Sequence, residues 1–265
     1  MKRKALIASI AGLTAVFGLA AAGLEWNGYH VFDRKDGGNA LCTLDPACRN
    51  LTSGEAQMIA SVFGRTLDPA KVKVFNRSFM GLIGTRVCSL SPNGNIYIPG
   101  YPSEVWKDFS QASNPLTRKH FIHESTHVWQ YQSGRSVLKE ALEAFLEHDY
   151  DYGAAYSYDI NTEADFRLLN LEQQAELVSH HFAAKESLQE LLRERARLPL
   201  IAEACKTVKP LEALLGSIFP VGKEQACLST VPPRKHKKQP KPPPPAPPAS
   251  IKLDFSGCFD VQPGP

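Results

Sequence analysis

The sequence predicts an α+β domain that is mainly helical and has a small mixed or antiparallel sheet. Helix-capping residues precede several long periodic segments, and turn residues separate short stretches that alternate like strands. A length of 265 residues suits one domain with appendages. With 43% hydrophobic and 22% charged residues, the composition is that of a globular protein, which excludes a wholly disordered, collagen-like or coiled-coil chain.

The first helix is expected to follow an irregular segment over residues 25–50. Thr52 and Glu55 have the spacing of a capping box, in which each side chain binds the other residue's backbone N–H. This pattern predicts a helix that runs to about Phe63, because Gly64 can adopt the left-handed conformation that ends helices.

Short strands are expected next. The sequence KVKVF at 71–75 alternates like a half-buried strand. Residues 79–90 are a weaker candidate because two glycines interrupt them, and a turn at 91–94 leads into a strand at 95–98. Pro99 stops that strand or places it at the edge of the sheet.

Longer helices are expected to make up the rest of the domain. An Asn-Pro pair opens a helix over 114–132, and another follows over 136–148. The tyrosine-rich segment 150–160 is expected to be a loop. A second capping pattern predicts a helix over 170–197, and two shorter helices are expected before Thr230.

The N-terminus, residues 1–24, has the features of an export signal. Positive charges at 2–4 precede an uncharged run rich in alanine and leucine, and small residues at 20–22 suit a leader peptidase. The alternative is an uncleaved membrane anchor, because the apolar residues 5–24 can just span a bilayer. Either case predicts an exported body that is periplasmic, or anchored in the inner membrane and facing the periplasm.

The body, residues 25–230 with a core at 51–200, is expected to form the single domain. Nine of the 20 prolines lie in 231–250, a lysine-rich stretch that is expected to be a disordered linker, and 251–265 form a C-terminal tail. Because positive charge concentrates at the two ends of the chain, the body is mildly acidic, and we expect no nucleic-acid partner.

The cysteines agree with export. An even number in an oxidising compartment predicts disulfides, and proximity favours the pairs Cys42–Cys48 and Cys205–Cys227. The alternative for Cys88, which lies in an apolar run, is a free buried thiol. No CxxC pair is present, so a thiolate zinc site or a thioredoxin-like role is disfavoured. The six cysteines are Cys42, Cys48, Cys88, Cys205, Cys227 and Cys258.

An HExxH motif, His123-Glu124-Ser125-Thr126-His127, lies inside an expected helix. Residues four apart lie on one helix face, so both imidazoles can bind one ion. Glu124 sits at the edge of that face, where it can reach a metal-bound water and act as general base. The alternative is a helix with two ordinary histidines. It is disfavoured because apolar flanks indicate a buried helix, whose polar groups need partners.

A catalytic zinc site needs a third protein ligand and one open position. The metzincin pattern would place glycine at 130 and histidine at 133, where this chain has Gln130 and Ser133. A carboxylate is the remaining common ligand, and Glu172 and Glu176 lie four apart on another expected helix. We assign Glu172 as the ligand and Glu176 as the acceptor of a hydrogen bond from a ligand histidine. The reverse assignment stays open, and on its own the pair would indicate a solvated acidic face.

Side chains that stabilise an oxyanion or contact the substrate are also expected. Tyr152, Tyr156, Tyr158 and His180 are candidates, and sequence does not rank them. The remaining histidines of this region are expected to be ordinary surface residues, namely His120, His148 and His181.

Several runs together resemble the zincin-like domain of Vgr-related proteins, which also occurs fused to the spike proteins of type VI secretion systems. The resemblance covers roughly residues 51–183, and its most specific parts are HVWQYQ after the HExxH motif and NLEQQAE downstream. It implies a zincin-like fold and a zinc metallopeptidase of gluzincin type. The implied ligands are His123, His127 and Glu172, and Glu124 is the implied catalytic residue. The other matching runs are LTSGEAQMIASVFG, VKVFN and SPNGNIYIP.

The expected function is a zinc-dependent metallopeptidase that hydrolyses a protein or the peptide stem of the cell wall. The chain's own leader and proline-rich tail favour a resident envelope enzyme over a delivered one. One alternative is a secreted antibacterial effector with the same chemistry. Another is a non-catalytic envelope protein whose metal site is structural or vacant. The strand at 95–98 is expected either to bind an extended peptide at the sheet edge or to be purely structural.

Overall fold

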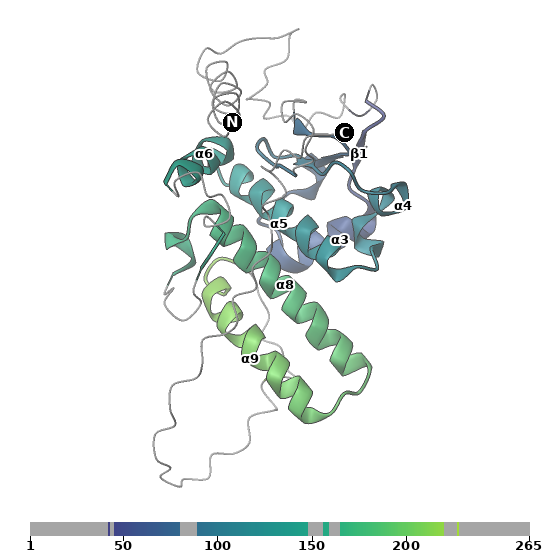
Figure 1. The fold of residues 1–265 in the computed structure, drawn as a ribbon, viewed down its shortest axis with the longest axis vertical. Helices are drawn as coiled ribbons and strands as arrows, with labels where there is room; N and C mark the ends of the chain where they lie inside the picture. Colours follow the sequence, from purple (N-terminus) through teal and green to yellow (C-terminus); the bar gives the residue numbers. More distant parts are fainter. Residues whose placement is uncertain are drawn as a thin grey trace, which may run out of the picture.

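A computed structural model describes most of the expected domain (Figure 1). The described residues are 42, 45–79, 89–147, 156–158, 165–219 and 227. Within these ranges, none of the helices has the length and apolar character of a membrane span. The expectations that lie outside the described residues concern the leader 1–24, the linker 231–250, the tail 251–265, most of 79–90 and 150–160, Cys88, Cys258, His148 and Tyr152.

The sheet has three short strands, β1 (Cys48–Asn50), β2 (Lys73–Phe75) and β3 (Ile96–Tyr97), in the order β1-β2-β3. β1 is antiparallel to β2 and β2 is parallel to β3, so the expected small mixed sheet is confirmed. The strand expected at 71–75 is shorter because a 3-10 helix (Pro69–Lys71) occupies its start. The sequence does not predict β1, since its three residues show no alternation.

The outer edge of β3 is partly covered. Tyr97 and Leu90 exchange both of their backbone hydrogen bonds, each 3.0 Å long. Of the two interpretations of 95–98, peptide binding at the sheet edge or a purely structural strand, the first therefore meets an edge already occupied at Tyr97. A substrate peptide could pair with this residue only by displacing Leu90.

Three long helices begin at the caps that the sequence predicts. The Thr52 capping box is present, the Asn114 side chain accepts from the backbone N–H of Leu116, and Asn170 forms a second capping box. These caps satisfy backbone N–H groups that a helix start otherwise leaves unpaired. The described helices are α3 (Ser53–Phe63), α4 (Ser103–Lys107), α5 (Pro115–Gln132), α6 (Val137–Glu147), α8 (Leu171–Arg193) and α9 (Leu198–Leu215), with further 3-10 turns at Phe109–Gln111 and Phe166–Leu168.

The C-terminal helices differ from the expectation. The helix predicted over 170–197 ends at Arg193, and in place of two shorter helices there is the single helix α9, which continues through Pro210. Pro199 lies in the first turn of α9, where its missing N–H costs nothing. Pro210 does remove an internal hydrogen bond, but burial of Leu211 and other apolar side chains against α8 keeps the helix continuous.

The turn that ends α8 places an arginine where helices favour glycine. Arg195 has φ +53°, and the backbone N–H groups of Arg195 and Ala196 donate to the carbonyls of Leu192 and Leu191. This is the hydrogen-bond pattern of a Schellman motif. Gly134 has a positive φ of +90° at the end of α5, so the chain uses glycine in one such turn and arginine in the other.

Replacing Arg195 by glycine is therefore expected to raise the free energy of unfolding by roughly 1 kcal/mol, because the left-handed conformation penalises a residue with a Cβ atom. Urea unfolding of the two proteins measures the difference. Gly134→Ala is the matched opposite change, since an added Cβ there meets no atom within 4 Å and only the backbone cost remains. Equal or lower stability of the Arg195→Gly variant contradicts this account.

The main hydrophobic core lies between α3, the sheet, α5 and α8. Its fully buried side chains include Phe63, Val74, Phe121, Ile122 and Leu177. α5 packs along α8, and α8 packs against α9 as a helical hairpin (Figure 1). α5 therefore lies within the protein, and most of its polar side chains are buried.

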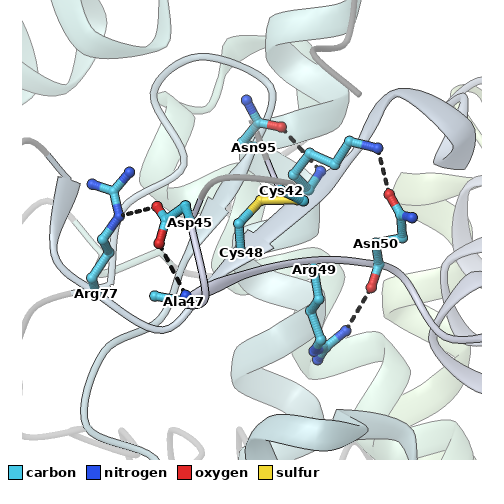
Figure 2. The surroundings of a disulfide bond; sticks show 9 residues. Cys42, Asp45, Ala47, Cys48, Arg49, Asn50, Arg77 and Asn95 are labelled. Carbon is cyan, nitrogen blue, oxygen red and sulfur yellow. Dashed lines mark hydrogen bonds and ion pairs between the residues drawn. A yellow bond between two sulfur atoms is a disulfide. The ribbon is translucent and has the colours of Figure 1, made fainter. Parts of the chain in front are cut away.

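Figure 2 shows the expected Cys42–Cys48 disulfide, which is confirmed and closes a short loop before β1. Within this loop the Asp45 carboxylate accepts hydrogen bonds from the backbone of Ala47 and the guanidinium of Arg77, both 2.9 Å long. The disulfide and Asp45 together hold the start of β1 against the segment after β2.

The expected Cys205–Cys227 disulfide is also confirmed. It joins α9 to a position 22 residues further along the chain. Around it, Leu188 of α8 and Ile201 and Val208 of α9 form a second, smaller core. This disulfide therefore stabilises the α8–α9 hairpin, whose first helix carries part of the site described next.

Candidate metal centre

The centre of α5 is polar and buried at the same time. His123, Glu124, Ser125, Thr126 and His127 each expose less than a tenth of their surface. The two hydroxyls are satisfied within the helix, because they donate to carbonyls one turn earlier at 2.7 and 2.9 Å. The two imidazoles and the carboxylate therefore need partners from outside α5.

Glu172, in the first turn of α8, lies against both imidazoles. Its Oε2 atom is 3.3 Å from His123 Nε2 and 3.2 Å from His127 Nε2. The centroids of the two imidazole rings are 5.0 Å apart. One potential metal-ligand atom from each of the three residues lies within 4.8 Å of the other two. The three residues predicted as metal ligands are thus brought to one point, and this group could hold a metal ion.

These separations suit a small tetrahedral cation. Ligand bonds of about 2.0–2.1 Å in tetrahedral geometry place neighbouring ligand atoms about 3.3 Å apart. The distances from Glu172 Oε2 to the two Nε2 atoms, 3.2 and 3.3 Å, match that value.

Glu176 contacts the opposite nitrogen of His123. Its Oε2 atom is 3.2 Å from His123 Nδ1, while its Oε1 atom binds Lys119 Nζ at 2.6 Å and His180 Nε2 at 3.1 Å. A carboxylate on the far nitrogen fixes the ring and leaves Nε2 directed at the centre. Glu172 therefore lies at the Nε2 atoms of both histidines, and Glu176 lies behind His123.

The buried charges around the centre are negative in sum and would be balanced by a divalent cation. Glu124, Glu172 and Glu176 are buried carboxylates, and the buried ammonium of Lys119 pairs with Glu176. Burial opposes ionisation, yet the neighbouring histidines keep the pKa of all three carboxyls below the ordinary value, and His123, His180 and Lys119 hold that of Glu176 at about 2. With His123 and His127 neutral, as metal ligands must be, the three carboxylates and the Lys119 ammonium leave two negative charges to balance.

The pKa values of the histidines reflect the same imbalance. Burial alone lowers the pKa of His123, but hydrogen bonds and charges from Glu172 and Glu176 outweigh it and raise the value to about 10. The pKa of His127 is also raised, because Glu172 outweighs burial there. A divalent cation at this point would serve the same purpose as protons on the imidazoles, because it too places positive charge beside the buried carboxylates.

Glu124 is held by two residues that the sequence analysis does not select. Ser91 Oγ donates to Glu124 Oε2 at 2.7 Å, and His120 Nε2 lies 3.5 Å from Glu124 Oε1. Tyr101 Oη is 3.0 Å from the other nitrogen of His120. The expectation that His120 is an ordinary surface residue is therefore wrong. Its position four residues before Glu124 on the same helix could have revealed this contact.

The candidates for oxyanion or substrate contacts take different positions. The Tyr156 ring stacks on His123 with centroids 5.6 Å apart. Tyr158 Oη binds His180 Nδ1 at 2.7 Å, and His180 binds Glu176 with its other nitrogen, so this pair contacts the outer side of the centre. Burial lowers the pKa of His180 to about 4, so the ring is neutral near pH 7. His181, expected at the surface, is buried instead.

A pocket of about 340 Å³ borders the centre. Its walls include Tyr101, Lys119, His120, His123 and Glu176, from α5, α8 and the segment before α4. The pocket thus reaches His123, a predicted metal ligand, and offers space for a substrate beside the centre.

The fold and the site define a class: a mainly helical α+β domain with a buried His-His-Glu group that could hold a metal ion. The chain is 32% identical over 146 residues to the type VI secretion system spike protein VgrG2b of Pseudomonas aeruginosa. This match covers 54% of the chain but 14% of the spike protein's length. It confirms the expected resemblance to Vgr-related proteins.

A solved structure shares the fold. The effector domain of Pseudomonas aeruginosa VgrG2b matches with a TM-score of 0.50 and 22% sequence identity, over 79% of this chain and 98% of that domain. No family model matches the chain. The comparisons therefore show a fold in common with an effector domain.

Proposed function

We propose that this protein is a zinc-dependent metallopeptidase that acts outside the cytoplasm. The observation that carries the proposal is the meeting of His123 Nε2, His127 Nε2 and Glu172 Oε2 at one buried point. Two histidines and one carboxylate are a common ligand set of catalytic zinc, which keeps a fourth position open. Zinc held there would supply a Lewis acid that polarises a carbonyl and lowers the pKa of water.

Glu124 is the general base in this proposal. Ser91 and His120 hold its carboxylate in place, and as a carboxylate it can take a proton from the attacking water. The same carboxyl then donates that proton to the leaving amine. Tyr156, beside His123, is the candidate closest to the centre for stabilising the charge that develops on the carbonyl oxygen.

We further propose that the enzyme is an effector of the type VI class. The shared fold with an effector domain and the sequence match to a spike protein support this over a resident envelope enzyme. Its substrate would then be a periplasmic protein or the peptide stem of the cell wall. The alternative of a non-catalytic envelope protein remains distinguishable, because it predicts no bound metal or a site closed by a fourth protein ligand.

Metal analysis of the purified full-length chain tests the enzymatic proposal. We expect one zinc ion per chain, hydrolysis of a peptide or peptidoglycan substrate, loss of both on chelation, and recovery of both with added zinc. A chain that takes up no metal from zinc-containing buffer contradicts the proposal. For the effector class, we expect growth arrest when the chain is directed to the periplasm and none when it stays in the cytoplasm.

A further inference from the structure

Gln130 connects a predicted metal ligand to the helix that supplies another. It lies on α5 three residues after His127 and is fully buried. Its Oε1 atom is 2.9 Å from His127 Nδ1, and its Nε2 atom donates to the Leu171 carbonyl and to Gln174 Oε1, both at 3.0 Å. Leu171 directly precedes Glu172 in α8. The Gln130 amide therefore contacts one predicted ligand, His127, and the backbone next to another, Glu172.

The orientation of this amide follows from its partners. Gln174 Nε2 donates to the backbone carbonyls of Phe166 and Leu169, both at 3.1 Å, so Gln174 presents its oxygen to Gln130. That oxygen and the Leu171 carbonyl can only accept, so Gln130 must present its NH₂ group to them.

The consequence reaches the His127 ring. With its NH₂ group used, Gln130 offers only its oxygen to His127, so Nδ1 must carry a hydrogen. The remaining nitrogen, Nε2, is the one 3.2 Å from Glu172. A chain of hydrogen bonds that ends on fixed backbone carbonyls therefore leaves Nε2 as the nitrogen that can bind a cation.

We propose that Gln130 is a positioning residue that orients His127 and fixes the register between α5 and α8, so that the ligand atoms of His127 and Glu172 meet. The proposal rests on the proposed function only in requiring a cation at this centre. The Arg135 guanidinium adds to the arrangement, since it also donates to Gln174 Oε1 and pairs with Glu140. The glutamine that stands where the metzincin pattern has glycine thus has a positioning role of its own.

Zinc and Co²⁺ titrations of the full-length Gln130→Leu variant test the proposal. Loss of such a partner of a ligand histidine is expected to weaken zinc binding about 10–100-fold. The visible absorption of bound Co²⁺ should also change, because its intensity and position depend on coordination geometry. These readouts do not require activity.

Gln132 provides the matched control. It lies on the same helix and makes two hydrogen bonds, to the backbone N–H and carbonyl of Asp68, at 2.7 and 3.1 Å. Gln132→Leu therefore removes two part-buried hydrogen bonds of α5 that do not involve a predicted metal ligand. It should lower the urea midpoint, while zinc affinity and the Co²⁺ spectrum should match the wild type. If Gln130→Leu fails to fold, Gln130→Met provides a second test, because it keeps the length of the side chain, removes the same hydrogen bonds and should still weaken zinc binding.

The outcomes separate the two proposals. If the wild type binds zinc and Gln130→Leu binds it equally well, with the same Co²⁺ spectrum, the positioning role is wrong and the metal centre stands. If Gln132→Leu weakens zinc binding as much as Gln130→Leu, the effect is general loss of stability and the positioning role is again wrong. If the wild type binds no divalent cation, both proposals fail.

Discussion

Glu124→Gln should lower peptide hydrolysis about 10²–10⁴-fold while the chain still binds one zinc ion. Glutamine has the shape of glutamate, and its oxygen can still accept the hydrogen bond from Ser91 Oγ. An amide cannot take a proton from water at neutral pH. The loss should therefore fall on kcat, while zinc affinity changes little because Glu124 is not among the three residues that meet at the centre.

Hydrolysis rates and zinc content measured on the same preparations check this prediction. Glu186→Gln is a suitable control, because Glu186 is a partly buried glutamate of α8 that pairs with Arg118 at 3.0 Å. It removes a carboxylate and an ion pair without touching Glu124, and it should leave the rate near that of the wild type. Full activity in Glu124→Gln with zinc retained would show that another group acts as base.

Local signals explain how much of the fold is predictable. The caps at Thr52, Asn114 and Asn170 and the glycine after α5 depend on neighbours in sequence, so they locate three helix starts and one helix end well. The departures depend on distant packing. α9 continues through Pro210 because its apolar side lies on α8, and β1 exists because β2 pairs with it.

At the metal centre, too, local sequence predicts some contacts and distant packing decides the others. The spacing of His123 and His127 is a property of one helix, so sequence alone brings them together. Glu172 and Glu176 both face α5, and only the register of α8 against α5 decides which of them lies at the two Nε2 atoms. Ser91 is 33 residues from Glu124 and comes from the loop before β3, which no local pattern reveals.

Glu172 and Glu176 of α8 should differ strongly in how much zinc affinity is lost when each is replaced by glutamine. Glu172→Gln is expected to lower zinc affinity by more than about 100-fold, whereas Glu176→Gln should lower it about 10–100-fold. Glu172 Oε2 lies 3.2–3.3 Å from both ligand nitrogens, so the first change removes a ligand and its charge at the centre. Glu176 is one turn further on and acts through His123 Nδ1, so the second change weakens a ligand without removing one.

Competition titrations with a zinc chelator measure both affinities, and far-UV circular dichroism checks that both variants fold. The pair is its own control, because the substitution, the helix and the degree of burial are the same. Glu176→Gln leaves Lys119 with an amide in place of a carboxylate, so part of its effect should come from the unbalanced ammonium, and Lys119→Met in the same chain should recover that part. A greater loss of zinc from Glu176→Gln than from Glu172→Gln would reverse the assigned roles, since the cation would then depend more on the carboxylate behind His123 than on the one between the two imidazoles.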